Sequence, residues 1–129
     1  MPLVRITLSE KYNQETQDLI SKSIHQALIK EFNVPEDDYF HIIESVKPGQ
    51  LRYPETYLGV KHTEAILFVH ITASIGRSVE QKKNLYKSIA LNIEKSTQIN
   101  PQEIIVVLTE NVKENWSFGN GELQTFNHI

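Results

Sequence analysis

Apolar and polar side chains alternate from Leu3 to Leu8, which is the period of a half-buried strand. After Asn13, a candidate N-cap, the period becomes that of a helix with one buried stripe. The stripe consists of Ile20, Ile24, Ala27, Leu28 and Phe32. Pro35 marks the end of this helix, and Tyr39 to Val46 returns to an extended pattern. The first part of the chain is therefore predicted to be strand, helix, strand.

The same order returns in the second half of the chain. Ala65 to Ala73 is a strongly apolar strand, and Ser78 to Gln81 has the Ser-x-x-Gln form of a capping box. The stripe of the helix that follows consists of Leu85, Tyr86, Ile89, Ala90 and Ile93. Pro101 ends the helical stretch, and we expect Ile104 to Leu108 to be a buried strand.

The two halves also match residue by residue. Val4-Arg5-Ile6-Thr7 and Val69-His70-Ile71-Thr72 agree at three of four positions, and Pro101 answers Pro35 at nearly the same offset. This ordered series indicates two copies of one unit. We place the copies at about 2–48 and 65–112, with a closing tail at 113–129, in one domain spanning 1–129.

Two such units side by side predict an α/β fold (α+β in some schemes): a tandem β-α-β repeat whose four-stranded sheet carries both helices on one face. The other face is then apolar and uncovered, so we expect copies of the chain to associate. We interpret 50–60 as an extended link between the copies, and Gly119-Asn120-Gly121 as a turn.

The composition excludes several classes of reaction and of binding partner. A chain of 129 residues without cysteine excludes a disulfide scaffold and a thiol nucleophile. The net charge of −3 argues against nucleic acid or an anionic membrane as a partner. With no long apolar run and no signal peptide, we expect a cytoplasmic protein. The five histidines lack the i,i+4 spacing of helical metal ligands, so we expect no metal and no cofactor.

Pro2 is the residue most able to do unusual chemistry. A small second residue generally permits removal of the initiator Met1, which makes proline the N-terminus. Its amine would titrate near neutral pH, and an apolar site or a neighbouring cation lowers its pKa further. Such an amine serves as a general acid or base, whereas many Met-Pro starts are only tolerated chain ends. Pro2 differs because it runs directly into the first predicted strand.

Arg77 and Asp38 are two further candidates. Arg77 lies between a strand and a capping Ser78, where anions bind in such folds, although a solvated loop arginine is favoured on the residues alone. Asp38 belongs to an acidic turn with Glu36 and Asp37, and the residues alone do not choose among the three.

Trp116 and Phe118, in Trp116-Ser117-Phe118-Gly119, either pack a core or form an apolar wall beside an amine. Together with Pro2, the two β-α-β copies and Gly76-Arg77-Ser78, this motif resembles the tautomerase superfamily, most closely the malonate semialdehyde decarboxylase-like subgroup. The resemblance covers nearly the whole chain. It implies a homotrimer with a pocket around each terminal proline.

By position, the resemblance makes Pro2 the catalytic amine and Asp38 a carboxylate that acts with water or the proline. Arg77 matches the second of two family arginines. Trp116, Phe118 and Phe126 would form the hydrophobic wall, and Phe126 matches only with a one-residue insertion after Gly121.

One departure affects the predicted reaction. The decarboxylase pattern is Arg-Pro-Arg where this chain has Ile75-Gly76-Arg77, so Ile75 takes the place of one carboxylate-binding cation in the substrate pocket. We therefore expect keto-enol tautomerisation of a small 2-oxo acid, with Arg77 holding the carboxylate and Pro2 moving a proton. Two alternatives stay open: decarboxylation of malonate semialdehyde or a similar 3-oxo acid, and a non-catalytic trimeric ligand-binding module.

Overall fold

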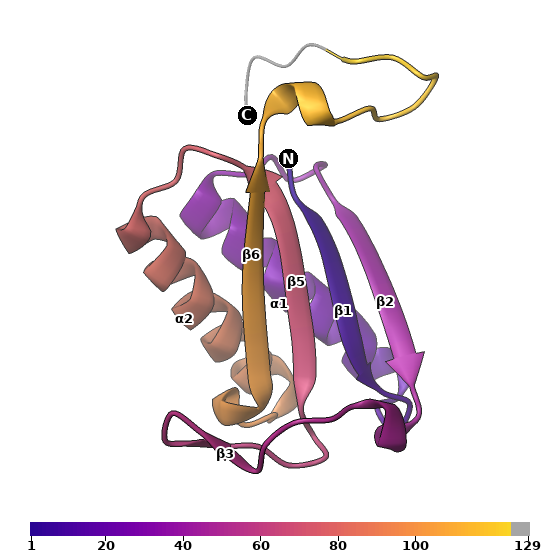
Figure 1. Cartoon of the computed structure of the whole chain (residues 1–129), viewed down its shortest axis with the longest axis vertical. Helices are drawn as coiled ribbons and strands as arrows, with labels where there is room; N and C mark the ends of the chain where they lie inside the picture. The colour runs from indigo at the N-terminus through magenta and orange to yellow at the C-terminus, as the bar shows by residue number, and fades with distance from the viewer. Residues whose placement is uncertain (125–129) are drawn as a thin grey trace.

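The computed structural model, which describes residues 1–124, is a four-stranded sheet backed by two helices (Figure 1). The elements of the two β-α-β units are β1 (Leu3–Ser9), α1 (Gln14–Phe32), β2 (Phe40–Val46), β5 (Leu67–Ser74), α2 (Val79–Thr97) and β6 (Ile104–Asn111). The sheet order is β2-β1-β5-β6. Pairing is parallel within each unit, and the antiparallel pair β1–β5 joins the two units at the centre. The predicted tandem repeat and four-stranded sheet are confirmed.

Both helices begin where the sequence predicts. The Asn13 side chain accepts a hydrogen bond from the Thr16 backbone at 2.8 Å, which satisfies one free N–H of α1. Ser78 and Gln81 form the reciprocal capping box of α2. α1 ends at Phe32, ahead of Pro35, because the next residue is left-handed.

Both helices pack on one face of the sheet, and the core lies between these layers (Figure 1). Alternate residues of the two central strands point into it, and the helix stripes meet them from the other side. The largest fully buried side chains include Ile6, Leu8, Ile20, Ile24, Leu28, Ile71, Leu85, Ile89 and Ile93. The predicted stripes therefore form one shared core.

The link between the units is more structured than the extended segment we predicted. It begins with a 3-10 turn, η1 (Pro48–Gln50), and continues into a hairpin of β3 (Thr56–Tyr57) and β4 (Val60–Lys61). Two short 3-10 turns, η2 (Pro101–Glu103) and η3 (Lys113–Asn115), flank β6. In the tail, Glu122 donates its backbone N–H to the Gly119 carbonyl, which confirms the predicted turn.

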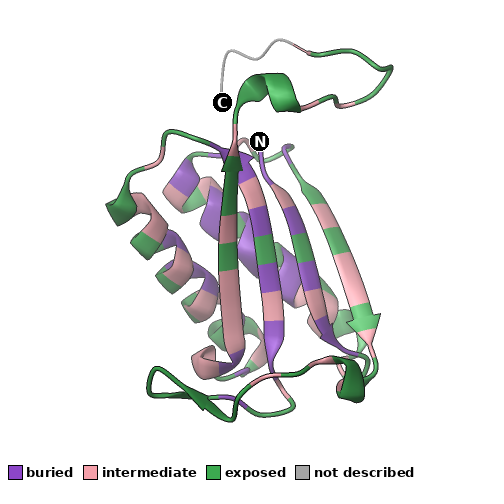
Figure 2. Cartoon of the chain, viewed as in Figure 1, coloured by how far each residue is buried: buried purple, intermediate pink, exposed green. Residues whose placement is uncertain are grey.

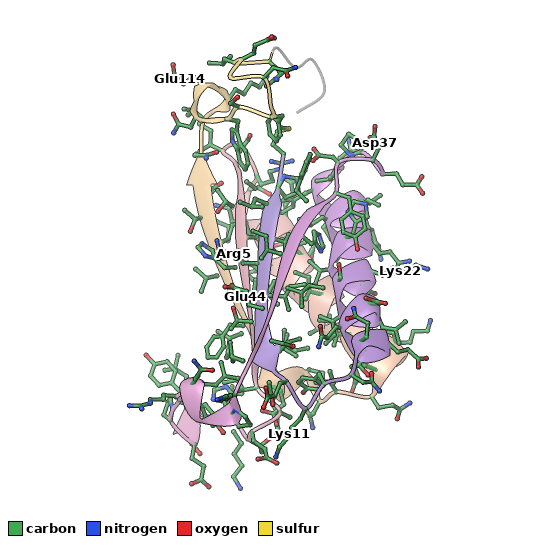
Figure 3. All side chains as sticks on the ribbon, turned by 90° about the vertical axis from the view of Figure 1, so that its right-hand side faces the viewer. Arg5, Lys11, Lys22, Asp37, Glu44 and Glu114 are labelled. Carbon is green, nitrogen blue, oxygen red and sulfur yellow. The ribbon has the colours of Figure 1, made fainter. Side chains whose placement is uncertain are left out.

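No helix or strand of the described residues covers the second face of the sheet, and Figure 2 shows buried and exposed positions alternating along the strands. Phe40, Ile42 and Val107 are exposed there. Arg5 and Glu44 form a two-point ion pair across β1 and β2 on this face, each contact at 3.3 Å (Figure 3). The expectation that Ile104–Leu108 is buried is wrong for the single chain, because β6 is an edge strand with one face open.

Within residues 1–124, no helix is long and apolar enough to cross a membrane.

Candidate active site

The N-terminus lies at the end of the sheet where β5 and β6 finish and β2 starts (Figure 1). Met1 and Pro2 are both buried, and Met1 is only 3% exposed. Leu3 pairs with Phe40 on one side and with Thr72 on the other. Because both neighbouring strands hold β1 from its first residue, the N-terminal amine is kept in a defined place.

Asp38 is the acidic residue that faces this amine. The Met1 amine nitrogen lies 3.3 Å from Asp38 Oδ2, and Asp38 is only 8% exposed. Its backbone N–H closes a turn on the Pro35 carbonyl at 3.1 Å. Glu36 and Asp37 stay in solvent, and Figure 3 shows Asp37 projecting from the loop after α1. The structure thus separates three acids that the sequence left equivalent.

The electrostatics of the amine are set by opposing effects. Burial lowers the pKa of the Met1 amine below its usual value of 8.0, and this is the largest effect. The Asp38 carboxylate raises that pKa, whereas the positive charge of Arg77 lowers it. The net result is a lowered pKa, which favours exchange of a proton near neutral pH.

Arg77 is half-buried at the same end of the sheet, and it is not a solvated loop arginine. Gly76 adopts a φ of 121°, a conformation that side-chain-bearing residues rarely adopt, and so turns the chain between β5 and α2. Arg77 Nη1 donates to the Ser74 carbonyl at 3.1 Å and Nη2 to the Phe32 carbonyl at 3.0 Å. The guanidinium carbon also lies 4.8 Å from the centre of the Phe32 ring.

These hydrogen bonds anchor Arg77 and use donors on two of its nitrogens, whereas a guanidinium carries five N–H donors in all. Burial lowers the pKa of Arg77, and the charges of Glu110 and Asp38 raise it. Because the pKa of a guanidinium lies far above neutral pH, Arg77 stays charged. It therefore places a fixed cation near the amine and Asp38.

An aromatic cluster borders this end of the sheet. Trp116 stacks on Phe118 with ring centres 5.3 Å apart, and Phe118 lies 5.5 Å from Phe40. The Trp116 indole donates to Asn111 Oδ1 at 2.6 Å, which ties the tail to the end of β6. Since Phe40 pairs with Leu3 in the sheet, the cluster reaches the strand that carries the N-terminus.

Ile75 and Phe126 complete the predicted set. Ile75 is 59% exposed, and its backbone N–H donates to the Asn111 carbonyl at 2.9 Å. Its side chain supplies no charge where the resemblance leads one to expect a cation. Phe126 lies outside the described residues.

Three residues that contact Arg77 or the aromatic cluster are not among those predicted from the sequence. Phe40 extends the aromatic cluster, Phe32 supports Arg77 from the end of α1, and Ser74 lies at the end of β5. Their shared signal is position, since Phe32 ends α1, Phe40 begins β2 and Ser74 ends β5.

The same end of the sheet carries a buried amine, a carboxylate, a guanidinium and an aromatic cluster. An amine beside a carboxylate can accept or deliver a proton, and a guanidinium can hold a carboxylate with paired hydrogen bonds. Within residues 1–124, no group of three or more metal-ligating side chains comes together.

Comparison with known proteins gives a consistent picture. Two family models described as tautomerase enzymes match this chain, one over residues 38–119 and the other over 2–59. The probable tautomerase YusQ of Bacillus subtilis (strain 168) is 39% identical over 124 residues, which cover 96% of this chain and 98% of YusQ.

Two solved structures are similar over nearly their full length. FG41 malonate semialdehyde decarboxylase, inhibited by 3-bromopropiolate, has a TM-score of 0.89 and 25% identity, covering 95% of this chain and 92% of its own. A malonate semialdehyde decarboxylase studied for its decarboxylase and hydratase activities has a TM-score of 0.88 and 28% identity, covering 94% and 93%. The family-model matches, the sequence identity to YusQ and the shared fold together establish that this chain belongs to the tautomerase superfamily.

Proposed function

We propose that this protein interconverts the keto and enol forms of a small 2-oxo acid, using the amine of Pro2 after Met1 is removed. The observation that carries the proposal is the buried amine of Met1, the residue before Pro2, which lies 3.3 Å from Asp38 and within the electrostatic influence of Arg77. Membership of the tautomerase superfamily supports the reaction class.

Removal of Met1 has two consequences at this site. The terminal nitrogen becomes that of Pro2, about 3.8 Å further along the chain by the Cα spacing of a trans peptide. The space that the buried Met1 side chain occupies becomes free for a ligand. A site filled by its own N-terminal residue thus becomes a pocket in front of a secondary amine.

Each residue then has a role in the proton transfer. Arg77 holds the substrate carboxylate. The enol oxygen first loses its proton to a water molecule, which leaves negative charge on that oxygen, and protonated Pro2 then delivers its proton to carbon 3. The substrate leaves as the keto acid, and the proton taken up by water returns to Pro2. Asp38 favours the charged form of the proline between turnovers, and the stacked rings of Trp116 and Phe118 form the apolar border of the site.

The test is the ketonisation of enol-phenylpyruvate by wild type and by Pro2→Ala. We expect the variant to lose at least tenfold in kcat/KM, since general acid-base groups contribute about 10²–10⁴-fold. Pro54→Ala, at an exposed proline before the hairpin, is the matched control and should retain wild-type rates. Intact mass must show that Met1 is absent. Equal rates for wild type and Pro2→Ala would refute the proposal.

Decarboxylation of malonate semialdehyde or a similar 3-oxo acid is the second candidate. The buried Asp38 beside the amine and the similarity to two malonate semialdehyde decarboxylases favour it. Ile75 weighs against it, because this exposed apolar side chain replaces a cation. Release of carbon dioxide from malonate semialdehyde, abolished by Asp38→Asn, would favour this reaction. Its absence would eliminate it.

The third candidate, a non-catalytic ligand-binding module, is tested by the same mass measurement. If Met1 remains attached, Pro2 nitrogen is an amide and has no basic lone pair to move a proton. Retention of Met1 together with binding of a 2-oxo acid would support this module over both enzymes.

We further propose that the working unit is a homotrimer. The uncovered sheet face exposes Phe40, Ile42 and Val107, and such an apolar face in a tautomerase fold is expected to be buried between copies.

A further inference from the structure

Five buried side-chain atoms in residues 1–124 have no hydrogen-bond partner. They are Ser74 Oγ, both carboxylate oxygens of Asp38, His25 Nδ1 and His41 Nε2. Asp38 Oδ2 is ion-paired with the Met1 amine at 3.3 Å, so Asp38 Oδ1 and Ser74 Oγ are the two atoms at this end of the sheet that have neither a hydrogen bond nor an ion pair. Because nearly all buried polar groups in native proteins are paired, this concentration calls for an explanation.

Ser74 lies at the last position of β5, on the same end of the sheet as the amine. Leu67, Val69, Ile71 and Ala73 are the residues of β5 that point into the core, so Ser74 belongs to the opposite, uncovered face. Despite this position it is only 4% exposed.

The sheet register places Ser74 beside the N-terminus. Leu3 pairs with Thr72 in the antiparallel pair, so the same register continued two residues brings Met1 opposite Ser74. The Ser74 carbonyl accepts a hydrogen bond from Arg77 at 3.1 Å. Ser74 is therefore flanked by the N-terminal residue and by the cation that we assign to the substrate carboxylate.

A buried hydroxyl without a partner destabilises the folded state, and alanine in its place would remove that cost. Removal of Met1 takes away the buried residue opposite Ser74. The Ser74 hydroxyl then faces the pocket that Met1 leaves. The chain therefore holds an unused donor where the proposed substrate binds.

We propose that Ser74 is a substrate-binding residue whose hydroxyl donates a hydrogen bond to the C2 oxygen of the 2-oxo acid. This inference rests on the proposed function. As the substrate passes between keto and enol forms, negative charge develops on that oxygen, and a preorganised donor stabilises it. Arg77 then holds the carboxylate, Ser74 the C2 oxygen, and Pro2 faces carbon 3.

The experiment compares Ser74→Ala, Ser74→Thr and wild type, all with Met1 removed, by thermal unfolding and enol-phenylpyruvate kinetics. We expect Ser74→Ala to unfold at an equal or higher temperature, yet to lose at least tenfold in kcat/KM, mostly in kcat. Ser74→Thr keeps the hydroxyl and should recover most of the rate. Ser45→Ala, at an exposed strand serine paired with Leu8 at the opposite end of the sheet, should retain wild-type kinetics.

The outcomes separate this inference from the proposed function. If wild type ketonises the substrate and Ser74→Ala does so equally well, the assignment of Ser74 is wrong and the proposed function stands. A lower unfolding temperature of Ser74→Ala with a matching loss of active protein would overturn the assignment in favour of a structural role. If wild type itself is inactive, the proposed function fails and the role of Ser74 fails with it.

Discussion

At the scale of residues, the N-terminal amine and Asp38 are coupled. In the chain that retains Met1, burial lowers the pKa of the Met1 amine, Asp38 raises it and Arg77 lowers it. Within residues 1–124, Asp38 is the neighbour that favours the charged amine. The charge of Asp38 should therefore control how readily the amine holds its proton.

In Asp38→Asn that retains Met1, we expect the pKa of the Met1 amine to fall further, because burial and Arg77 then act without opposition from Asp38. The pH dependence of N-terminal acetylation, followed by mass spectrometry, measures this pKa. Asp37→Asn removes the same charge from an exposed neighbour and should leave the pKa nearly unchanged. A similar fall in both variants would mean that only net charge matters.

At the scale of elements, α1 and β2 meet through a polar cluster at the edge of the layers. Ser21 Oγ lies 2.6 Å from the Tyr39 hydroxyl and 2.8 Å from His41 Nδ1. His25 stacks on Tyr39 with ring centres 4.3 Å apart, and its Nε2 lies 2.7 Å from the Glu36 carbonyl oxygen. Burial, reinforced by the charge of His25, lowers the pKa of His41 from 6.5 to about 4.

This lowered pKa makes stability depend on pH. The unfolded chain binds a proton at His41 near pH 6.5, but the folded chain does so only near pH 4. The free energy of unfolding therefore has its full value above pH 6.5 and decreases as the pH falls toward 4. We expect a loss of about 1–2 kcal/mol in unfolding free energy, discounted from the full linkage value because His41 is partly exposed. Asp18, Lys22 and Glu36 line the neighbouring groove and contribute their own charges.

Urea unfolding between pH 7 and pH 4.5 measures this effect. His41→Asn should flatten the pH dependence, whereas His70→Asn, at an exposed histidine of β5, should leave it as in wild type. A wild-type slope in His41→Asn would assign the acid sensitivity to another group.

At the scale of the whole molecule, one face of the sheet has no helix over it among residues 1–124 (Figure 2). The face combines apolar side chains with the Arg5–Glu44 pair, which is screened by water in the single chain. An apolar sheet face of this kind is stable in water when another copy covers it. The proposed trimer is the assembly that the family resemblance implies.

We expect wild type to be trimeric by light scattering and Val107→Asp to be monomeric, since a charge buried without a partner is costly. Leu91→Asp is the matched control, because Leu91 is 51% exposed on α2 and Val107 is 53% exposed on the uncovered sheet face. The control should remain a trimer. A monomeric wild type, or a trimeric Val107→Asp, would contradict the proposed assembly.

Two features of the fold are not predicted by the sequence pattern. The sequence predicts an extended link at 50–60 and not the hairpin, because the strands β3 and β4 have only two residues each and are too short to display a period. Ile104–Leu108 looked buried because an apolar run does not reveal whether its strand is central or at an edge.

The sequence by itself determined the helices, their caps and the two β-α-β units. Each of these depends on residues within a few positions of one another, as in the bond from Thr16 to Asn13 or the Ser78–Gln81 box. Only the tertiary structure decided that Asp38 faces the amine, that Arg77 reaches the end of α1, and that Ser74 lies opposite the N-terminus. These contacts join distant parts of the chain through the β1–β5 register and the turn after α1, and no local spacing encodes them.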